Sequence, residues 1–488
     1  MKYDVAILGG GSAGYAAART AAGAGLKTVV IEGGEEVGGL CILRGCMPTK
    51  ALLYAAEVMH LAGHTEPWGI RTAKTGFNFK KVMARKNALI REFADYRAQQ
   101  LVSGKFEFLR ARARFLDAHT VELSVLDGRA GHSVPAVRKK ERAGAQRTNA
   151  PYPGDHLTAR HFVIATGSFV APPPLPSLNE VGFITSDQAL ALKQLPKSLI
   201  VLGGGPVACE FTQFFARFGV KVTQIQRGPH MLHDFDADAA SLIEAVFRRE
   251  GVKLFTGTKL LDARRKGRLK TIWFECGGRT ISASAEEILL ALGRRPNTGL
   301  LDLEKAGVAT EYGRVVANGF MQTSVPHIYA AGDCTGPYEI VHLAVQQGEA
   351  AGRHIANPGA SPPMDYRLLI SVVFTDPQVA FVGMTEKEAA ARGIPYLAAS
   401  YPFSDHGKSL IMDARDGFVK LLADSKTGEI IGGVCIGPLG GELIHEIAAA
   451  MAKRMTVHEL AAMPHYHPTL AEIWTYPAEE LAGKIRPE

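Results

Sequence analysis

The sequence predicts an α/β protein with two doubly wound, Rossmann-like domains and a C-terminal α+β domain. Two stretches share one pattern, in which an apolar strand is followed by a glycine-rich turn, a helix of small residues and a second apolar strand. This is how a doubly wound domain begins. Beyond about residue 364 the apolar residues instead follow the periods of paired strands and then of a helix. The length of 488 residues supports several domains, because single hydrophobic cores stop growing well below that size.

The first glycine-rich turn follows a strand expected at residues 5–8 and precedes a helix to about residue 24 and a strand at 28–31. A Gly-x-Gly-x-x-Gly turn at a helix N-terminus lets backbone amides approach a pyrophosphate, which the helix dipole favours. Glu32 ends the second strand, where a carboxylate accepts hydrogen bonds from ribose hydroxyls. The sequence therefore predicts a dinucleotide site formed by Gly9, Gly11, Ser12, Ala13, Gly14 and Glu32.

The second glycine-rich turn lies between strands expected at residues 199–202 and 221–225. Its candidate nucleotide-binding residues are Gly203, Gly205, Pro206 and Val207. Gln226 occupies the position that corresponds to Glu32, and Arg227 follows it, so no carboxylate repels a ribose 2′-phosphate there. This favours NADPH slightly over NADH. The alternative, that Arg227 is a solvated turn residue, stays open.

Two proline-rich breaks divide the chain. The run at residues 171–176 fits neither a helix nor a central strand and is expected to be a linker, and residues 357–363 form a second break. Strands are expected near 418–422 and 430–435, followed by a helix with an apolar face, and Thr456 with Glu459 predicts a capping box. The predicted domain segments are 1–170, 171–290, 291–358 and 364–488.

Composition restricts the location and the partners. Six cysteines in this length are too few for a disulfide scaffold, and the sequence shows neither an export signal nor a membrane-spanning run. We therefore expect a cytoplasmic protein without a membrane or nucleic-acid partner, and we expect no metal site. The net charge of +7 either steers an acidic partner or maintains solubility, and part of it comes from a basic insertion near residues 138–147.

The most specific motif runs from Gly38 to Lys50 and contains Cys41 and Cys46. Five residues apart at the start of a helix, the two thiols are expected to lie close enough to bridge, and the helix N-terminus and Lys50 would favour a thiolate. The segment resembles the redox-active signature of the class I pyridine nucleotide-disulfide oxidoreductases, the family of dihydrolipoyl dehydrogenase, glutathione reductase and mercuric reductase. Family motifs match in order along almost the whole chain.

This resemblance implies FAD and NAD(P)H as cofactors. It assigns Cys46 to the flavin side and Cys41 to exchange with the substrate, and it places Lys50 near the flavin, paired with Glu210 of the second glycine-turn helix. It also implies that a helix beginning near residues 343–344 points its positive end at the flavin. The further flavin-binding residues that it implies are Thr166, Gly167, Gly293, Asp333, Leu343 and Ala344.

A segment near the C-terminus, from His465 to Glu472, resembles the His-x-His-Pro-Thr motif of the family. The resemblance makes His467 the acid/base and Glu472 the carboxylate that orients its ring. Thiol–disulfide exchange needs such a proton carrier near neutral pH. The family pattern further implies a homodimer in which the C-terminal domain is the dimerisation domain and delivers His467 to the partner subunit's active site.

The implied activity is electron transfer between a dithiol and NAD(P) through FAD and a Cys41–Cys46 disulfide. A dihydrolipoyl group on a protein is the expected substrate, because Glu349 stands where glutathione reductases carry an arginine, although Arg19 matches an arginine of those enzymes. One alternative is an NADPH-dependent reductase of glutathione, another small disulfide or another acceptor. A second alternative, of another class, is a flavin-bearing binding partner in a lipoyl-protein assembly.

Overall fold

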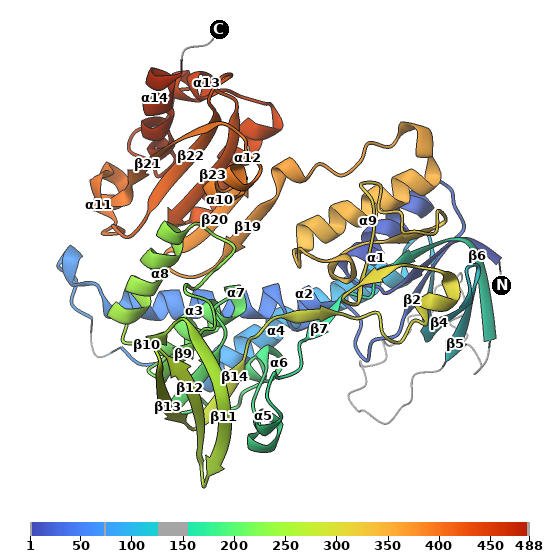
Figure 1. The fold of residues 1–488 in the computed structure, drawn as a ribbon, viewed down its shortest axis with the longest axis horizontal. Coiled ribbons are helices and arrows are strands. Elements are labelled where there is room, and N and C mark those ends of the chain that lie inside the picture. Colours follow the sequence, from blue (N-terminus) through green and yellow to red (C-terminus); the bar gives the residue numbers. More distant parts are fainter. Residues whose placement is uncertain (1, 73–74, 125–154, 486–488) are drawn as a thin grey trace. The chain divides into compact units, whose positions relative to one another are not determined.

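The computed structural model describes residues 2–72, 75–124 and 155–485 (Figure 1). The predicted basic insertion near residues 138–147 lies outside these residues. The chain forms two compact units, and each unit is assembled from three separate segments. Unit 1 consists of Met1–Pro48, Arg85–Ala171 and Arg294–Asp365, and unit 2 consists of Thr49–Ala84, Pro172–Gly293 and Tyr366–Glu488. The division into four domain segments stays a prediction.

The centre of unit 1 is a sheet with the strand order β3-β2-β1-β6-β5-β4, in which β18 also pairs with β6. Its nucleotide-binding half is parallel, and the residues at 5–8 of β1 and 29–31 of β2 are all apolar and buried, as expected for strands covered on both faces. Two further pairs, β7 with β15 and β16 with β17, form small antiparallel sheets of their own. The strands of unit 1 are β1 (Lys2–Leu8), β2 (Thr28–Glu32), β3 (Glu107–Arg110), β4 (Arg112–Asp117), β5 (Thr120–Ser124), β6 (Asp155–Ile164), β7 (Ser168–Val170), β15 (Arg294–Pro296), β16 (Thr310–Glu311), β17 (Arg314–Val315) and β18 (Ile328–Ala330).

Two helices from distant parts of the sequence, α1 (Ser12–Gly23) and α9 (Val341–Ala356), pack side by side in unit 1 (Figure 1). A Cβ atom at Gly348 would collide with the carbonyl oxygen of Ala13, and one at Gly352 would lie 2.9 Å from the Cβ of Thr20. Only glycine allows this close approach of the two backbones. The unit also contains α2 (Leu40–Leu43) and most of α4 (Phe79–Val102).

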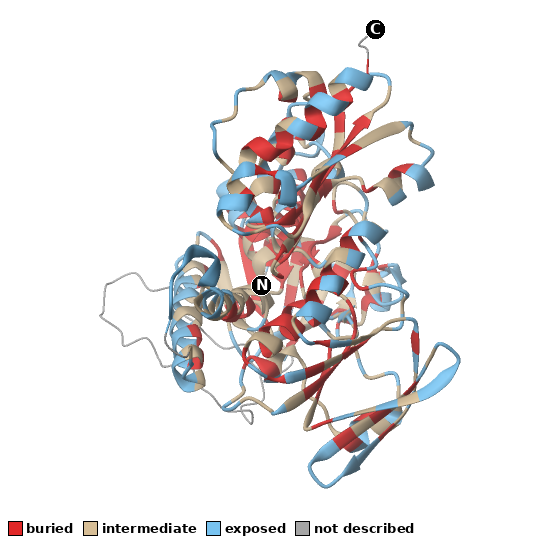
Figure 2. Cartoon of the chain, turned by 90° about the vertical axis from the view of Figure 1, so that its left-hand side faces the viewer, coloured by how far each residue is buried: buried red, intermediate tan, exposed pale blue. Residues whose placement is uncertain are grey.

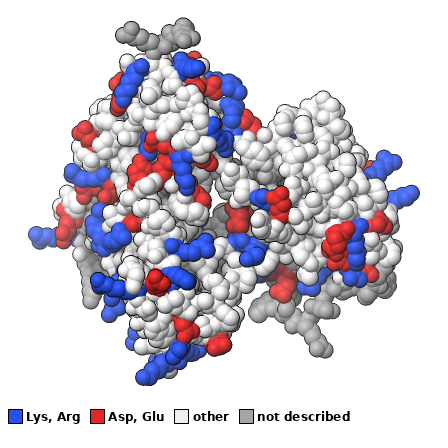
Figure 3. Space-filling model, viewed as in Figure 1, with Lys and Arg blue, Asp and Glu red and all other residues white. Residues whose placement is uncertain are grey.

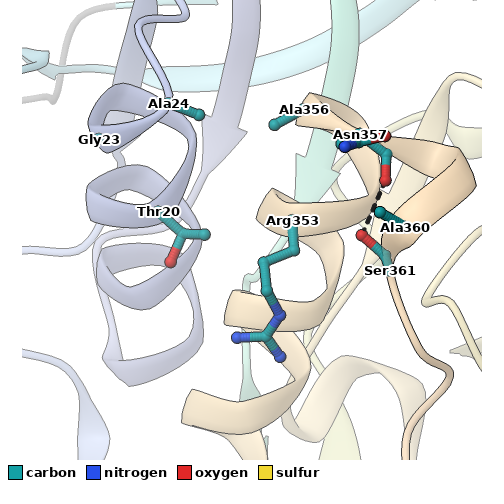
Figure 4. A pocket seen from close by; sticks show the side chains of 8 residues that line it. All are labelled: Thr20, Gly23, Ala24, Arg353, Ala356, Asn357, Ala360 and Ser361. Atoms are coloured by element: carbon teal, nitrogen blue, oxygen red, sulfur yellow. Dashed lines mark hydrogen bonds between the residues drawn. The ribbon is translucent and has the colours of Figure 1, made fainter.

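A shallow pocket of about 410 Å³ lies where the C-terminal ends of α1 and α9 meet (Figure 4). Small side chains and Arg353 line it, and Ser361 donates a hydrogen bond to the carbonyl oxygen of Asn357 at its edge. None of the catalytic residues predicted from the sequence lines this pocket.

Unit 2 contains a parallel sheet with the order β10-β9-β8-β14, which is the second glycine-turn domain. Phenylalanines of its helices, among them Phe211, Phe215 and Phe247, are fully buried in the core. An antiparallel sheet of three strands adjoins it in sequence. The elements are α5 (Pro176–Val181), α6 (Ser186–Ala189), β8 (Ser198–Leu202), α7 (Pro206–Arg217), β9 (Lys221–Ile225), α8 (Ala237–Arg249), β10 (Lys253–Phe255), β11 (Thr258–Lys266), β12 (Leu269–Cys276), β13 (Arg279–Ala285) and β14 (Glu287–Leu290).

The C-terminal part of unit 2 is an antiparallel sheet with the order β19-β20-β23-β22-β21, packed against helices. Buried residues follow its strands and one face of its helices (Figure 2). Thr456 and Glu459 form the predicted capping box. The elements are β19 (Ile370–Val373), β20 (Gln378–Gly383), α10 (Glu386–Ala391), β21 (Tyr396–Pro402), α11 (Gly407–Ile411), β22 (Phe418–Asp424), β23 (Ile430–Gly437), α12 (Gly440–Ala452), α13 (Val457–Ala462) and α14 (Thr475–Lys484).

Helix α3 (Cys46–Gly63) starts in unit 1 and continues into unit 2. No helix among the described residues has the length and the apolar character needed to cross a membrane. The predicted α/β fold class, with its two nucleotide-binding sheets and its α+β C-terminal part, is confirmed.

Candidate active site

The first glycine-rich turn connects β1 to α1 in unit 1. Gly9 has a φ of 109°, a conformation that favours glycine, and a Cβ atom at Gly14 would collide with the carbonyl oxygen of Gly9. A Cβ atom at Gly11 would meet no clash, because its nearest neighbour, the Cα of Gly39, would be at an ordinary contact distance of 3.9 Å. Ser12 and Ala13 begin α1, whose first turn, all of it described, carries no acidic side chain. The turn therefore leaves room for an anion at a helix N-terminus.

Glu32 lies beside this turn at the end of β2. Its Oε2 accepts a hydrogen bond of 2.8 Å from the N–H of Gly10, and its Oε1 accepts one of 2.6 Å from the N–H of Gly34. Both bonds hold the carboxylate at the edge of the glycine turn. This is where a ribose hydroxyl must be bound if a pyrophosphate occupies the turn.

The second half of the predicted flavin site comes from the two later segments of unit 1. Asp333 accepts a hydrogen bond of 2.6 Å from Ser168, which in turn accepts one of 2.7 Å from Nε of Arg294. The hydroxyl of Thr166 is buried and has no hydrogen-bond partner among the described residues. A buried hydroxyl needs a partner. The first glycine turn and Glu32, together called the glycine cradle, lie in the same unit. The residues present therefore fit a dinucleotide such as FAD.

The other predicted flavin residues are placed as follows. Gly167 follows Thr166, and Leu343 and Ala344 are buried in the first turn of α9. The helix begins at Val341, slightly earlier than predicted, and its first turn, which is fully described, has no acidic residue to oppose an anion. Gly293 is the last residue of the second segment of unit 2, so its role beside the flavin stays a prediction.

The cysteine motif passes directly along the glycine turn. A Cβ atom at Gly39 would lie 2.8 Å from the Cα of Gly11, so the backbone before α2 packs on the turn. Cys41 lies in α2 and Cys46 begins α3, and both are half-buried. Gly45 folds back on this helix, because a Cβ atom there would lie 3.1 Å from the Cα of Cys41. The motif thus holds both cysteines beside the glycine cradle.

Lys50 and Glu210 form an ion pair in unit 2. The Nζ of Lys50 donates to both carboxylate oxygens, at 2.8 Å and 2.9 Å, and the N–H of Phe374 donates to Oε1 at 3.0 Å. Glu210 is buried, so these three bonds offset the cost of burying its charge. The lysine also lies 4.6 Å from the centre of the Phe374 ring. Both side chains are therefore fixed in position.

His467 and Glu472 form a second ordered pair in unit 2. The Nδ1 of His467 lies 2.9 Å from Oε2 of Glu472. The carboxylate is buried, whereas the side chain of His467 is 78% exposed. Because Nδ1 faces the carboxylate, Nε2 is the ring nitrogen left to exchange a proton. The pair therefore has the geometry of an oriented acid/base.

The second glycine-rich turn connects β8 to α7 in unit 2. Gly203 has a φ of 127°, and a Cβ atom there would collide with the carbonyl oxygen of Ala291. The side chain of Gln226 lies over the turn, because its Cδ would be 2.7 Å from a Cβ atom at Gly204. Arg227 is exposed beside it. Gly205 faces open space, and Pro206 and Val207 form the first turn of α7.

Comparisons with known proteins decide the family. The family model described as pyridine nucleotide-disulphide oxidoreductase matches residues 3–348, and the model for the dimerisation domain of the same family matches residues 369–478. The chain belongs to the pyridine nucleotide-disulphide oxidoreductase family. It is a flavoprotein disulfide oxidoreductase that uses FAD and NAD(P)H.

Individual relatives agree with this family. The oxidoreductase is 36% identical to a dihydrolipoyl dehydrogenase of Bacillus subtilis over 476 residues, which is 96% of each chain. It is 30% identical to a mercuric reductase of Staphylococcus aureus over 96% of this chain and 81% of that protein. Among solved structures it is similar to LpdA of Mycobacterium tuberculosis, with a TM-score of 0.84, 28% identity and 99% coverage of both chains.

Two residues of this oxidoreductase carry features that sequence reasoning did not identify. Arg97, on α4, lies over the Tyr15 ring at 4.3 Å and within electrostatic reach of Cys41. Its Nε is buried without a hydrogen-bond partner among the described residues, and burial lowers the pKa of its guanidinium. Arg97 is one of several basic residues on α4, and nothing in the sequence separates it from the others. The second residue is His406, which lies behind Glu472.

Proposed function

We propose that this oxidoreductase transfers electrons between a dihydrolipoyl dithiol and NAD(P), with Cys41 and Cys46 as its redox disulfide. The observation that carries the choice of substrate is the ion pair between Arg19 and Glu349. The dihydrolipoyl dehydrogenases among the relatives support the same choice. Bound FAD supplies the two-electron path between the cysteine pair and the nicotinamide.

The chain's own residues carry out the exchange with the substrate. A substrate thiolate attacks Sγ of Cys41, breaks the Cys41–Cys46 bond and releases Cys46 as a thiolate. The second substrate thiol then attacks the substrate sulfur of this mixed disulfide. A cyclic disulfide forms and Cys41 leaves with its electron pair. Nε2 of His467 takes the proton of the first attacking thiol, and Glu472 holds its ring. In the second attack His467 gives this proton to Cys41 as its thiolate leaves and takes the proton of the second thiol.

The charge pattern near α1 and α9 disfavours glutathione. Glutathione disulfide carries several carboxylates and needs cations at its site. Arg19 pairs with Glu349, and Arg353, one turn further along α9, also reaches Glu349 at 3.5 Å. Glu349 therefore engages two guanidinium groups that an anionic substrate would need. A neutral dithiolane arm has no such requirement.

Substrate comparison tests this proposal. We expect kcat/KM to be highest for a lipoylated carrier protein, lower for free dihydrolipoamide and lowest for glutathione disulfide. Glu349→Arg should raise kcat/KM for glutathione disulfide by about tenfold or more, because it replaces repulsion with attraction. The matched variant Glu349→Gln releases Arg19 without adding a cation and should give a smaller gain. A wild-type enzyme that prefers glutathione disulfide would overturn the proposal.

We also propose that Arg227 binds the 2′-phosphate of NADPH. Arg227→Glu should then lower the ratio of kcat/KM for NADPH to that for NADH by about tenfold or more, because a cation becomes an anion. Arg227→Gln, which removes the cation only, should have a smaller effect. An unchanged ratio would show that Arg227 does not bind the phosphate. Weak wild-type activity with NADPH would instead favour NADH held through Gln226.

We propose that two copies of the chain form the active enzyme. The family's dimerisation model covers residues 369–478, which include His467 and Glu472. Tyr466 and His467 are both strongly exposed in one chain, as residues that meet a second subunit should be.

On the face in Figure 3, acidic and basic side chains are interspersed, so no patch of a single charge is visible there. The cytoplasmic location stays a prediction.

A further inference from the structure

A second histidine lies on the far side of Glu472. His406, between the short helix at residues 403–405 and α11, is completely buried. Its Nε2 lies 3.4 Å from Oε1 of Glu472, while Oε2 of the same carboxylate lies 2.9 Å from His467. The carboxylate is therefore placed between two imidazoles, one buried and one exposed. The family motif that identified His467 and Glu472 does not include His406.

The other ring nitrogen of His406 fixes its tautomer. Nδ1 lies 2.8 Å from Oγ of Ser409, which is also fully buried. Burial lowers the pKa of His406, so the ring is neutral at neutral pH and carries one N–H. If Ser409 donates to Nδ1, this proton lies on Nε2 and faces the carboxylate. The opposite tautomer would place a lone pair against a negative charge.

The negative charge of Glu472 has few positively charged or hydrogen-bonding neighbours besides the His406 ring. Among the described residues, the basic side chains within 4.0 Å of its carboxylate oxygens are those of His406 and His467. Besides Ser409, the Tyr476 ring of α14, the Phe403 ring and the two residues of the acid/base pair lie near His406. A buried carboxylate needs hydrogen-bond donors to remain charged. Nε2 of His406 is buried, has no hydrogen-bond partner of good geometry among the described residues, and lies 3.4 Å from Oε1 of Glu472.

We propose that His406 is a positioning residue, whose Nε2–H holds Glu472 in the orientation that accepts the Nδ1 proton of His467. Nε2 of His467 thereby stays the atom that exchanges protons with the substrate thiol. The proposal rests on the acid/base role given to His467 above. It deepens that role, because it assigns the orientation of the exposed ring to a buried residue 61 positions earlier in the chain.

A pair of variants separates this role from simple packing. His406→Leu fills similar space but cannot donate, whereas the amide of His406→Gln can still donate to Glu472. We expect His406→Leu to lower kcat for dithiol oxidation by about tenfold, because it removes the orienting contact with the carboxylate, and His406→Gln to recover most of it. The apparent KM for the nicotinamide should not change in either variant.

The tautomer of His467 provides a readout that is independent of the substrate. Nitrogen NMR of ¹⁵N-histidine-labelled protein should show neutral His467 mainly as the Nδ1–H tautomer in the wild type and in His406→Gln, and as a mixture in His406→Leu. If His406→Leu does not fold, Ser409→Ala keeps the ring but removes the bond that fixes its tautomer, and should move His467 in the same direction. An unchanged His467 tautomer, or equal loss in both His406 variants, would overturn the proposal. A normal tautomer shift without any lipoyl activity would instead contradict the proposed substrate.

Discussion

Replacing Cys46 with serine is expected to abolish disulfide turnover and to leave the FAD content at the wild-type level. Without Cys46 no internal disulfide can form, so the loss in kcat should reach at least about a thousandfold. FAD should remain bound, because the proposed cradle is built from the glycine turn, Glu32, Thr166 and Asp333 and uses no sulfur atom. Flavin absorbance per protein and steady-state turnover measure the two effects.

Cys276→Ser is the matched control for this experiment. Cys276 is also half-buried, lies in β12 and donates to the carbonyl oxygen of Thr256 at 3.6 Å. Its replacement should change neither turnover nor FAD content. A flavin-free Cys46→Ser protein that is otherwise folded would contradict the separation between the cradle and the redox pair.

Mixing two inactive variants should restore activity if the site is shared between subunits. Cys41→Ser lacks the exchanging thiol, and His467→Gln lacks the proton carrier, so each homodimer should be inactive. In a mixed dimer, one site combines the intact cysteine pair of one chain with the intact His467 of the other. Each mixed dimer should therefore show about half of the wild-type activity, as two-fold symmetry requires.

The experiment needs verified subunit exchange. Two distinguishable affinity tags allow mixed dimers to be isolated and counted before the assay. A mixture of Cys41→Ser and Cys46→Ser is the control, because no site in that mixed dimer has both thiols. Pure mixed dimers of the first pair without activity would show that His467 does not serve the partner subunit's cysteines.

Patterns of neighbouring residues in the sequence predicted the strands, glycine turns and helices of the two nucleotide-binding sheets. The two turn-and-helix segments lie where the glycines and apolar runs placed them, although β1 starts at Lys2, three residues before the predicted strand. The run of apolar residues predicted only the buried part of the strand. Lys2 and Tyr3 belong to β1 because they pair with β6, and this pairing cannot be predicted from the pattern of apolar residues. Strand β23 likewise extends two residues beyond its prediction, to Gly437.

Side-chain partners distant in sequence were much harder to predict. From the sequence, Arg19 was expected to favour glutathione binding and Glu349 to oppose it. In the structure the two side chains form an ion pair, although they are 330 positions apart in the chain. His406 has no local signal either, because a histidine before a short helix resembles any polar loop residue. Only the packing of α14 and the preceding turn brings Glu472 to it. These contacts depend on tertiary folding, which single-sequence patterns do not encode.

The close packing of α1 on α9 also fixes when this unit can be completed during synthesis. Helix α1 ends at Gly23, but the face that contains Ala13 and Thr20 is covered by a helix that begins at Val341. A ribosome must therefore translate more than two thirds of the chain before the first glycine turn obtains its final support. Until then the early helix has an uncovered small-residue face, and chaperones have a long interval in which to bind it.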